Sequence, residues 1–152
     1  GSQGLSSGIC FLLPLLNEVK NMIRKISGAF TGGAVGAFVY GINLWILAAL
    51  GIINLIGTNM RPVFTASGFY QRMIWGGILM LPLVFPLWKS RIVFRGCIFS
   101  LLPSAVMLFV VFPRAGRGLM GTEFGLMTPF LVIALNFISG IVAAYWYKSA
   151  AH

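Results

Sequence analysis

The chain has 152 residues, of which 59% are hydrophobic and 9% are charged, and its formal net charge at pH 7 is +9. A soluble domain carries about 25% charged residues, so we exclude a water-soluble fold and interpret the chain as an integral membrane protein. Because the basic residues lie between apolar segments, their charge indicates membrane topology and anionic lipid headgroups, and nucleic acid is not an expected partner.

The first 27 residues are expected to form a short tail and an amphipathic interfacial helix. Apolar residues recur at helical spacing from Leu12 to Ile26, and Lys20, Arg24 and Lys25 fill the opposite face. Basic amphipathic helices beside a membrane span tend to lie in the interface, and Ser27-Gly28 offers a bend before the span. The alternative is that this helix extends the first span into the cytoplasm.

The first predicted span covers residues 28–56, a stretch without a charged side chain. A straight helix of that length would measure about 45 Å against a hydrocarbon core of about 30 Å, so it must tilt, bend or end early, and Gly51 is a candidate end. Rows of small residues let helices approach closely in lipid. The first predicted span contains such rows, which we interpret as a helix-packing interface, either within this chain or with another subunit. Their members are Gly28, Gly32, Gly33, Gly36, Ala37 and Gly41.

Three further spans are expected at residues 69–88, 92–112 and 128–147. Pro82 and Pro86 predict a bent or broken end of the second span, and Pro103 lies in the middle of the third. The fourth span ends in Tyr145-Trp146-Tyr147-Lys148, an interfacial aromatic belt followed by a cation. The expected fold is therefore all-α: residues 28–152 form a four-helix transmembrane domain that follows the N-terminal interfacial helix.

The basic residues divide unequally between the two predicted sides of the membrane. The positive-inside rule places the richer side, and with it both termini, in the cytoplasm. The richer side holds Lys20, Arg24, Lys25, Lys89, Arg91, Arg95 and Lys148, and the poorer side holds Arg61, Arg72, Arg114 and Arg117.

Ionisable residues within the spans usually mark transport or catalysis, and this chain has almost none. It contains no Asp, both glutamates lie outside the predicted spans, and the single His ends the sequence. Proton relays, nucleophilic catalysis and metal or haem ligation therefore lack their parts, so we expect no enzymatic activity, no metal and no cofactor. Asn43 and Asn136 remain as intramembrane polar contacts, which line a pathway or, more commonly, form hydrogen bonds between helices.

The outer arginines, Arg61, Arg72, Arg114 and Arg117, are the best candidate for a binding site. Glycine-rich backbone between arginines can bind anions or phosphate headgroups, and loops carry function more often than cores do. The alternative is a solvated basic loop in which Glu123 forms one salt bridge.

Several motifs between residues 72 and 140 resemble small uncharacterised bacterial inner-membrane proteins. They include Arg72-Met73-Ile74-Trp75-Gly76-Gly77, Leu81-Pro82-Leu83 and Leu102-Pro103-Ser104. The resemblance implies a bacterial inner (cytoplasmic) membrane location and brings no known activity.

We therefore expect a small non-enzymatic membrane protein. The leading hypothesis is an accessory or assembly subunit that packs against other transmembrane subunits, or against itself, through its glycine-rich first span. The alternative is a homo-oligomeric channel or transporter with a pore at the subunit interface, where the positive loops favour a small anionic or neutral solute.

Overall fold

The computed structural model describes residues 2–61, 65–86 and 91–151, with side chains from residue 11 to residue 150 within those ranges. The described part of the chain is 85% helical and contains no strand, so the all-α class is confirmed. Its longer elements are α1 (Ser2–Ala49), α3 (Ala66–Leu79), α4 (Ile92–Val106) and α6 (Thr128–Ala151). Its shorter ones are α2 (Ile52–Leu55), the 3₁₀ turns η1 (Leu81–Val84) and η3 (Leu119–Phe124), the π-helical turn η2 (Met107–Val111) and α5 (Phe112–Arg114).

α1 is one continuous helix of 48 residues, about 72 Å long at 1.5 Å per residue. The chain stays helical through Ser27-Gly28, so the expected separate interfacial helix is not formed and the alternative, an extension of the first span, describes the structure. A glycine in a helix interior costs only about 1 kcal/mol relative to alanine. Ser27-Gly28 therefore permits a bend without imposing one.

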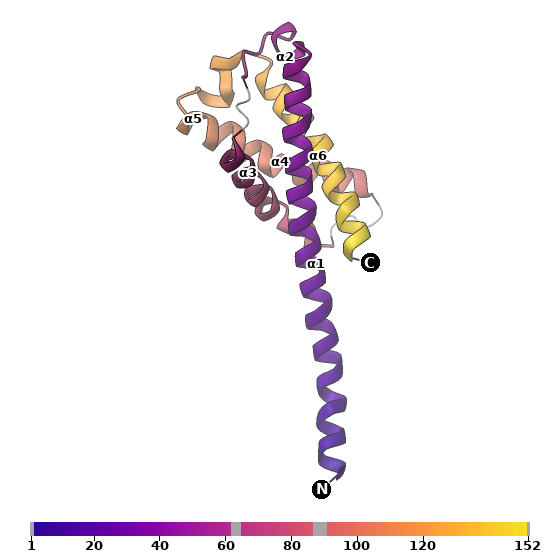
Figure 1. The fold of residues 1–152 in the computed structure, drawn as a ribbon. Helices are drawn as coiled ribbons and strands as arrows, with labels where there is room; N and C mark the ends of the chain where they lie inside the picture. Colours follow the sequence, from indigo (N-terminus) through magenta and orange to yellow (C-terminus); the bar gives the residue numbers. More distant parts are fainter. Residues whose placement is uncertain (1, 62–64, 87–90, 152) are drawn as a thin grey trace.

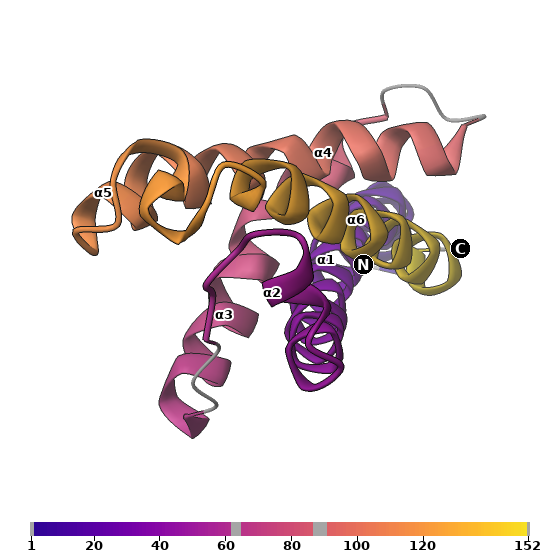
Figure 2. The ribbon, with the colours of Figure 1, turned by 90° about the horizontal axis from the view of Figure 1, so that it is seen from above.

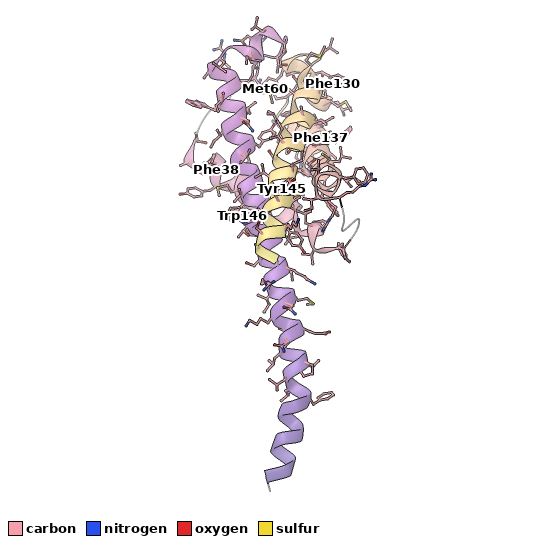
Figure 3. All side chains as sticks on the ribbon, turned by 90° about the vertical axis from the view of Figure 1, so that its right-hand side faces the viewer. Phe38, Met60, Phe130, Phe137, Tyr145 and Trp146 are labelled. Atoms are coloured by element: carbon pink, nitrogen blue, oxygen red, sulfur yellow. The ribbon has the colours of Figure 1, made fainter. Side chains whose placement is uncertain are left out.

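The N-terminal part of α1 projects from the rest of the molecule, and we call residues 2–27 the arm. Every side chain from residue 11 to residue 27 is exposed, whereas Gly28 and Ala29 are buried. The arm extends well beyond the other helices (Figure 1), and its side chains from residue 11 onward project around the helix, away from the other elements (Figure 3). The bundle therefore begins at Gly28.

The opposite end of α1 lies where the sequence predicts it. The helix stops at Ala49, and Gly51 has a φ of 72°, a left-handed conformation that costs glycine little because it has no Cβ. We call this end of the bundle the outer end, and the end from which the arm projects the inner end.

The prediction of a second membrane-length helix at residues 69–88 is wrong. α3 has 14 residues, about 21 Å, and the hydrocarbon core is about 30 Å thick. Pro82 at the start of η1 cannot donate the hydrogen bond that would continue α3, and residues 87–88, with Lys89, lie outside the described residues. Across the described ranges, three helices and not four are long and apolar enough to cross a membrane: Phe11–Ala49, Ile92–Arg114 and Thr128–Ala150.

α3 and η1 nevertheless return the chain from the outer end to the inner end. A side chain at Gly41 on α1 would meet the Phe69 ring near the start of α3, while Leu83 of η1 shares a buried cluster with Ala29. At the end of α6, the Trp146 Nε1–H donates to the Thr31 hydroxyl over 3.3 Å. The end of α6 therefore lies at the inner end, beside the base of the arm (Figure 3).

The bundle is built around α1 and α6. α1 packs against α6 and α3, and α4 packs against α6. α4, η2 and α5 form one unbroken helical stretch, Ile92–Arg114, in which Pro103 lies within α4 as expected. Figure 2 shows α3 and this stretch diverging from each other at a wide angle.

Candidate functional site

The small residues of α1 form two rows, Gly28-Gly32-Gly36 and Gly33-Ala37-Gly41. The first row faces α6 of the same chain. A Cβ atom at Gly32 would lie 2.8 Å from the Ala143 carbonyl oxygen, and one at Gly36 would lie 2.7 Å from the Ser139 carbonyl oxygen. Real Cβ atoms do not approach backbone oxygens so closely, so both positions require glycine for this helix contact.

The second row faces α3. A Cβ atom at Gly76 would lie 2.6 Å from the Ala37 Cβ, and Gly33 lies against the Gly76 carbonyl. Gly41 lies one step further along, against Phe69, and Gly28 is buried at the base of the arm. Both rows are thus covered by helices of this chain, so another subunit would have to bind elsewhere on the surface.

Two adjoining hollows open between α3 and the Ile92–Arg114 stretch. The first, which we call the groove, has a volume of about 710 Å³ and is formed by side chains of α1, α3, α6 and the Ile92–Arg114 stretch. The second, which we call the outer hollow, has a volume of about 350 Å³ and adds residues from the loops at the outer end. Arg72, Gly68 and Met107 line both hollows.

All four arginines of the predicted site line these hollows. Arg72 and Arg114 line the groove, and Arg61, Arg72 and Arg117 line the outer hollow. The structure therefore brings together arginines from separate segments of the chain, with Arg72 common to both spaces. Arg72 differs from the other three because it lies within α3 and is half-buried, whereas the others are exposed.

Local structure at the start of α3 sets the direction of Arg72. The Thr65 hydroxyl caps the helix by accepting a hydrogen bond from the Gly68 N–H at 3.3 Å. Phe69 meets Phe38 of α1 edge-on, with ring centroids 5.3 Å apart. Arg72 follows three residues later on the same helix face, and its guanidinium carbon lies 5.5 Å from the centre of the Tyr40 ring.

Tyr40 is a residue of this site that was not predicted from the sequence. Its side chain is only 5% exposed, and its hydroxyl group has no hydrogen-bond partner in the described structure. Tyr40 lines the groove together with Gln71 and Trp75. A tyrosine in the middle of an apolar span is a usable signal, since a buried Tyr hydroxyl normally finds a partner.

Aromatic contacts hold the loops of the outer hollow. Phe124 of η3 meets Phe112 at 5.8 Å between ring centroids, and the Arg117 guanidinium lies 5.0 Å from the centre of the Phe124 ring. The Phe124 carbonyl also accepts a hydrogen bond of 2.6 Å from the Asn59 N–H. The loop of Arg61 is thereby tied to the loop of Arg117.

The two asparagines of the spans are not brought together. Asn136 lines the groove and donates to the Val132 carbonyl at 2.9 Å, one turn back in α6. Asn43 is half-buried on α1 and lines neither hollow. The hydrogen bond of Asn136 therefore lies within its own helix and not between helices as expected.

Comparisons with models of protein families, with curated proteins and with solved structures give no match. The functional argument therefore depends on the geometry of this chain alone.

Proposed function

We propose that the protein is a small non-enzymatic membrane subunit that joins a larger membrane assembly through the apolar face of its arm. One observation carries this proposal. The apolar face of the arm is covered by no other helix among the described residues, and the side chains that form it are all exposed: Leu12, Leu15, Leu16, Val19, Met22, Ile23 and Ile26. Exposed apolar patches of this kind mark interaction surfaces.

The position of the bilayer supports a role outside the hydrocarbon core for the arm. Tyr145 and Trp146 form the aromatic belt expected at a headgroup boundary, and Trp146 meets Thr31. A core of about 30 Å corresponds to about 20 helical residues, which reach from Thr31 to Gly51, where α1 has ended. An upright bundle thus fills the bilayer and leaves the arm beyond it.

The glycine rows of α1 support the arm as the binding surface because they contact α3 and α6 of the same chain. The proposed binding surface is therefore the arm and not the glycine-rich face expected from the sequence. The proposed class of function, an assembly subunit, is the same. The positive-inside rule places the inner end, with both termini, on the cytoplasmic side, and the resemblance described above suggests a bacterial inner membrane.

Native mass spectrometry of the chain, extracted gently from its own membrane, tests the proposal. We expect a complex that contains other polypeptides beside the 16.5 kDa chain. A double variant on the apolar face, Leu16→Glu with Ile23→Glu, should release them. A matched variant on the polar face, Asn17→Glu with Asn21→Glu, adds the same charge to exposed positions and should keep them.

A monomer of 16.5 kDa, or equal loss of partners from both double variants, would contradict the assembly role. A clean multiple of that mass would instead favour the homo-oligomeric channel or transporter, and anion flux into liposomes would then be the decisive assay.

A further inference from the structure

The groove is polar at one end and apolar at the other. α3 begins near Gly41 and ends near Gly33, so its residues can be ordered along the bundle. Toward the outer end the groove is lined by Gln71, Arg72 and Arg114, and toward the inner end by Trp75, Leu79 and Met80. A space with this gradient matches a molecule that has an anionic head and an apolar chain.

Arg72 has no anionic partner within the described chain. The sequence contains only two acidic residues, neither of which lines the groove, and the one charge contact of Arg72 in the described structure is with the Tyr40 ring. Tyr40 lies nine residues beyond Thr31 on α1, about 14 Å along the helix and close to the middle of the bundle. Unpaired cations at such depth mark binding sites.

The Tyr40 hydroxyl is a second, independent indication of a ligand. It is buried without a hydrogen-bond partner in the described structure, and its residue lines the same groove as Arg72. A buried donor without a partner is costly unless something occupies the site. The guanidinium can only donate and the hydroxyl can donate, so one anionic hydrogen-bond acceptor satisfies both groups.

The sides of the groove indicate where the ligand comes from. Trp75 on α3 and Val110 and Val111 on the facing wall line the groove and are 53%, 44% and 43% exposed. In a membrane, apolar side chains at such a mouth face the acyl chains, so entry is lateral from the bilayer. The volume of about 710 Å³ lies within the range of about 300–1,000 Å³ of small-molecule sites.

We propose that the groove holds one anionic glycerophospholipid from the surrounding bilayer. Its phosphate accepts hydrogen bonds from Arg72, Arg114 and the Tyr40 hydroxyl, and one acyl chain lies along Trp75, Leu79 and Met80 toward the inner end. Arg61 and Arg117 in the outer hollow lie on the side of the headgroup and favour a net negative charge there. This role goes beyond assembly through the arm and is independent of it.

Native mass spectrometry of the purified full chain measures this binding when detergent contains equal amounts of phosphatidylglycerol and phosphatidylcholine with identical acyl chains. We expect one phosphatidylglycerol to be retained per chain in preference to phosphatidylcholine. Tyr40→Phe and Arg72→Gln should each lower that retention roughly tenfold, the effect of losing a hydrogen bond to a charged group. Arg91→Gln removes the same charge from an exposed position at the inner end and should leave retention unchanged.

Tyr40→Phe keeps the test decisive even where Arg72→Gln fails to fold. The substitution removes one oxygen that has no partner in the described chain, so a purely structural role for Tyr40 predicts no loss of either stability or lipid. Equal retention by the wild type and Tyr40→Phe would overturn the proposal, as would equal retention of the two lipids. Displacement of the lipid by inorganic phosphate would assign the site to a free anion and would also overturn it.

The lipid experiment detects the mass of a bound lipid, whereas the assembly experiment detects the mass of partner polypeptides. Loss of the lipid without loss of partner polypeptides would therefore leave the assembly role intact. Loss of partner polypeptides without loss of the lipid would leave the lipid site intact.

Discussion

At the scale of single residues, close backbone contact between helices depends on positions that admit no side chain. Gly36 and Gly32 on α1 lie under carbonyl groups of α6, and Gly96 and Gly140 form the corresponding contact between α4 and α6. In lipid such contacts replace the hydrophobic effect as the source of helix association. These glycines therefore determine whether the bundle forms.

Gly36→Leu is predicted to destabilise the bundle, because the new side chain must displace α6 from α1. Overpacking of this kind costs about 1–3 kcal/mol, which thermal unfolding in detergent would detect as a lower midpoint. Ala105→Leu, at an exposed position of α4, is the control and should unfold with the wild type. Equal midpoints for the two variants would show that α1 and α6 are not packed as described.

Arg95 illustrates a different role for a basic residue, since its contacts lie within the chain. Its guanidinium donates to the carbonyl oxygens of Leu83 and Phe85, the latter at 3.1 Å, and lies 5.7 Å from the centre of the Tyr147 ring. It thereby holds the end of η1 against the base of α4 and α6.

Arg95→Leu should lower the free energy of unfolding by about 1.5–3 kcal/mol, the contribution of hydrogen bonds to a charged group. Arg91→Leu removes an exposed arginine from the same end of the molecule and should cost much less. Chemical unfolding in mixed micelles measures both changes. If Arg91→Leu proves the more damaging substitution, the anchoring role of Arg95 is wrong.

At the scale of elements, the sequence predicts the helices well where apolar length decides the outcome. α6 begins at Thr128 as predicted, and α1 ends just before Gly51 as predicted. The failures have two physical causes. Pro82 and the 3₁₀ turn that contains it shorten the second span, and α1 continues through Ser27-Gly28 because a glycine within a helix weakens the helix without ending it.

Removal of residues 2–24 from the arm should leave the stability of the bundle nearly unchanged, within about 0.5 kcal/mol. The physical reason is that side chains 11–27 are exposed and contribute no buried contact to the bundle. Thermal unfolding of the truncated and full chains in the same detergent measures the difference. A large fall in the midpoint would mean that the arm folds back onto the other helices.

The candidate site shows a further limit of sequence reasoning. The four arginines were recognisable because cations separated by glycine-rich loops are uncommon within so apolar a chain. The groove was not recognisable, because it arises from the angle between α3 and the Ile92–Arg114 stretch (Figure 2). That angle is set by the Gly33–Gly76 and Gly96–Gly140 contacts, which join segments far apart in the sequence. Tyr40 offered a signal only as a polar side chain within an apolar span.

At the scale of the whole molecule, three long apolar helices and one short one carry the chain across the bundle four times. The arm and the end of α6 thereby share the inner end, and the outer hollow, which three of the four arginines line, lies at the outer end. We propose separate tasks for two surfaces of this bundle: assembly for the apolar face of the arm, and lipid binding for the groove.

Labelling of single cysteines with a membrane-impermeant maleimide, in sealed vesicles of known orientation, tests this architecture most directly. Cys10 and Cys97 are first replaced by Ser, and one cysteine is then introduced at Asn17 on the polar face of the arm, or at Ala105, Arg117 or Ser149, all of which are exposed. The account predicts that Asn17→Cys and Ser149→Cys react from one side, Arg117→Cys reacts from the other, and Ala105→Cys reacts from neither. Reaction of Asn17→Cys and Arg117→Cys from the same side, or protection of Asn17→Cys from both sides, would contradict it.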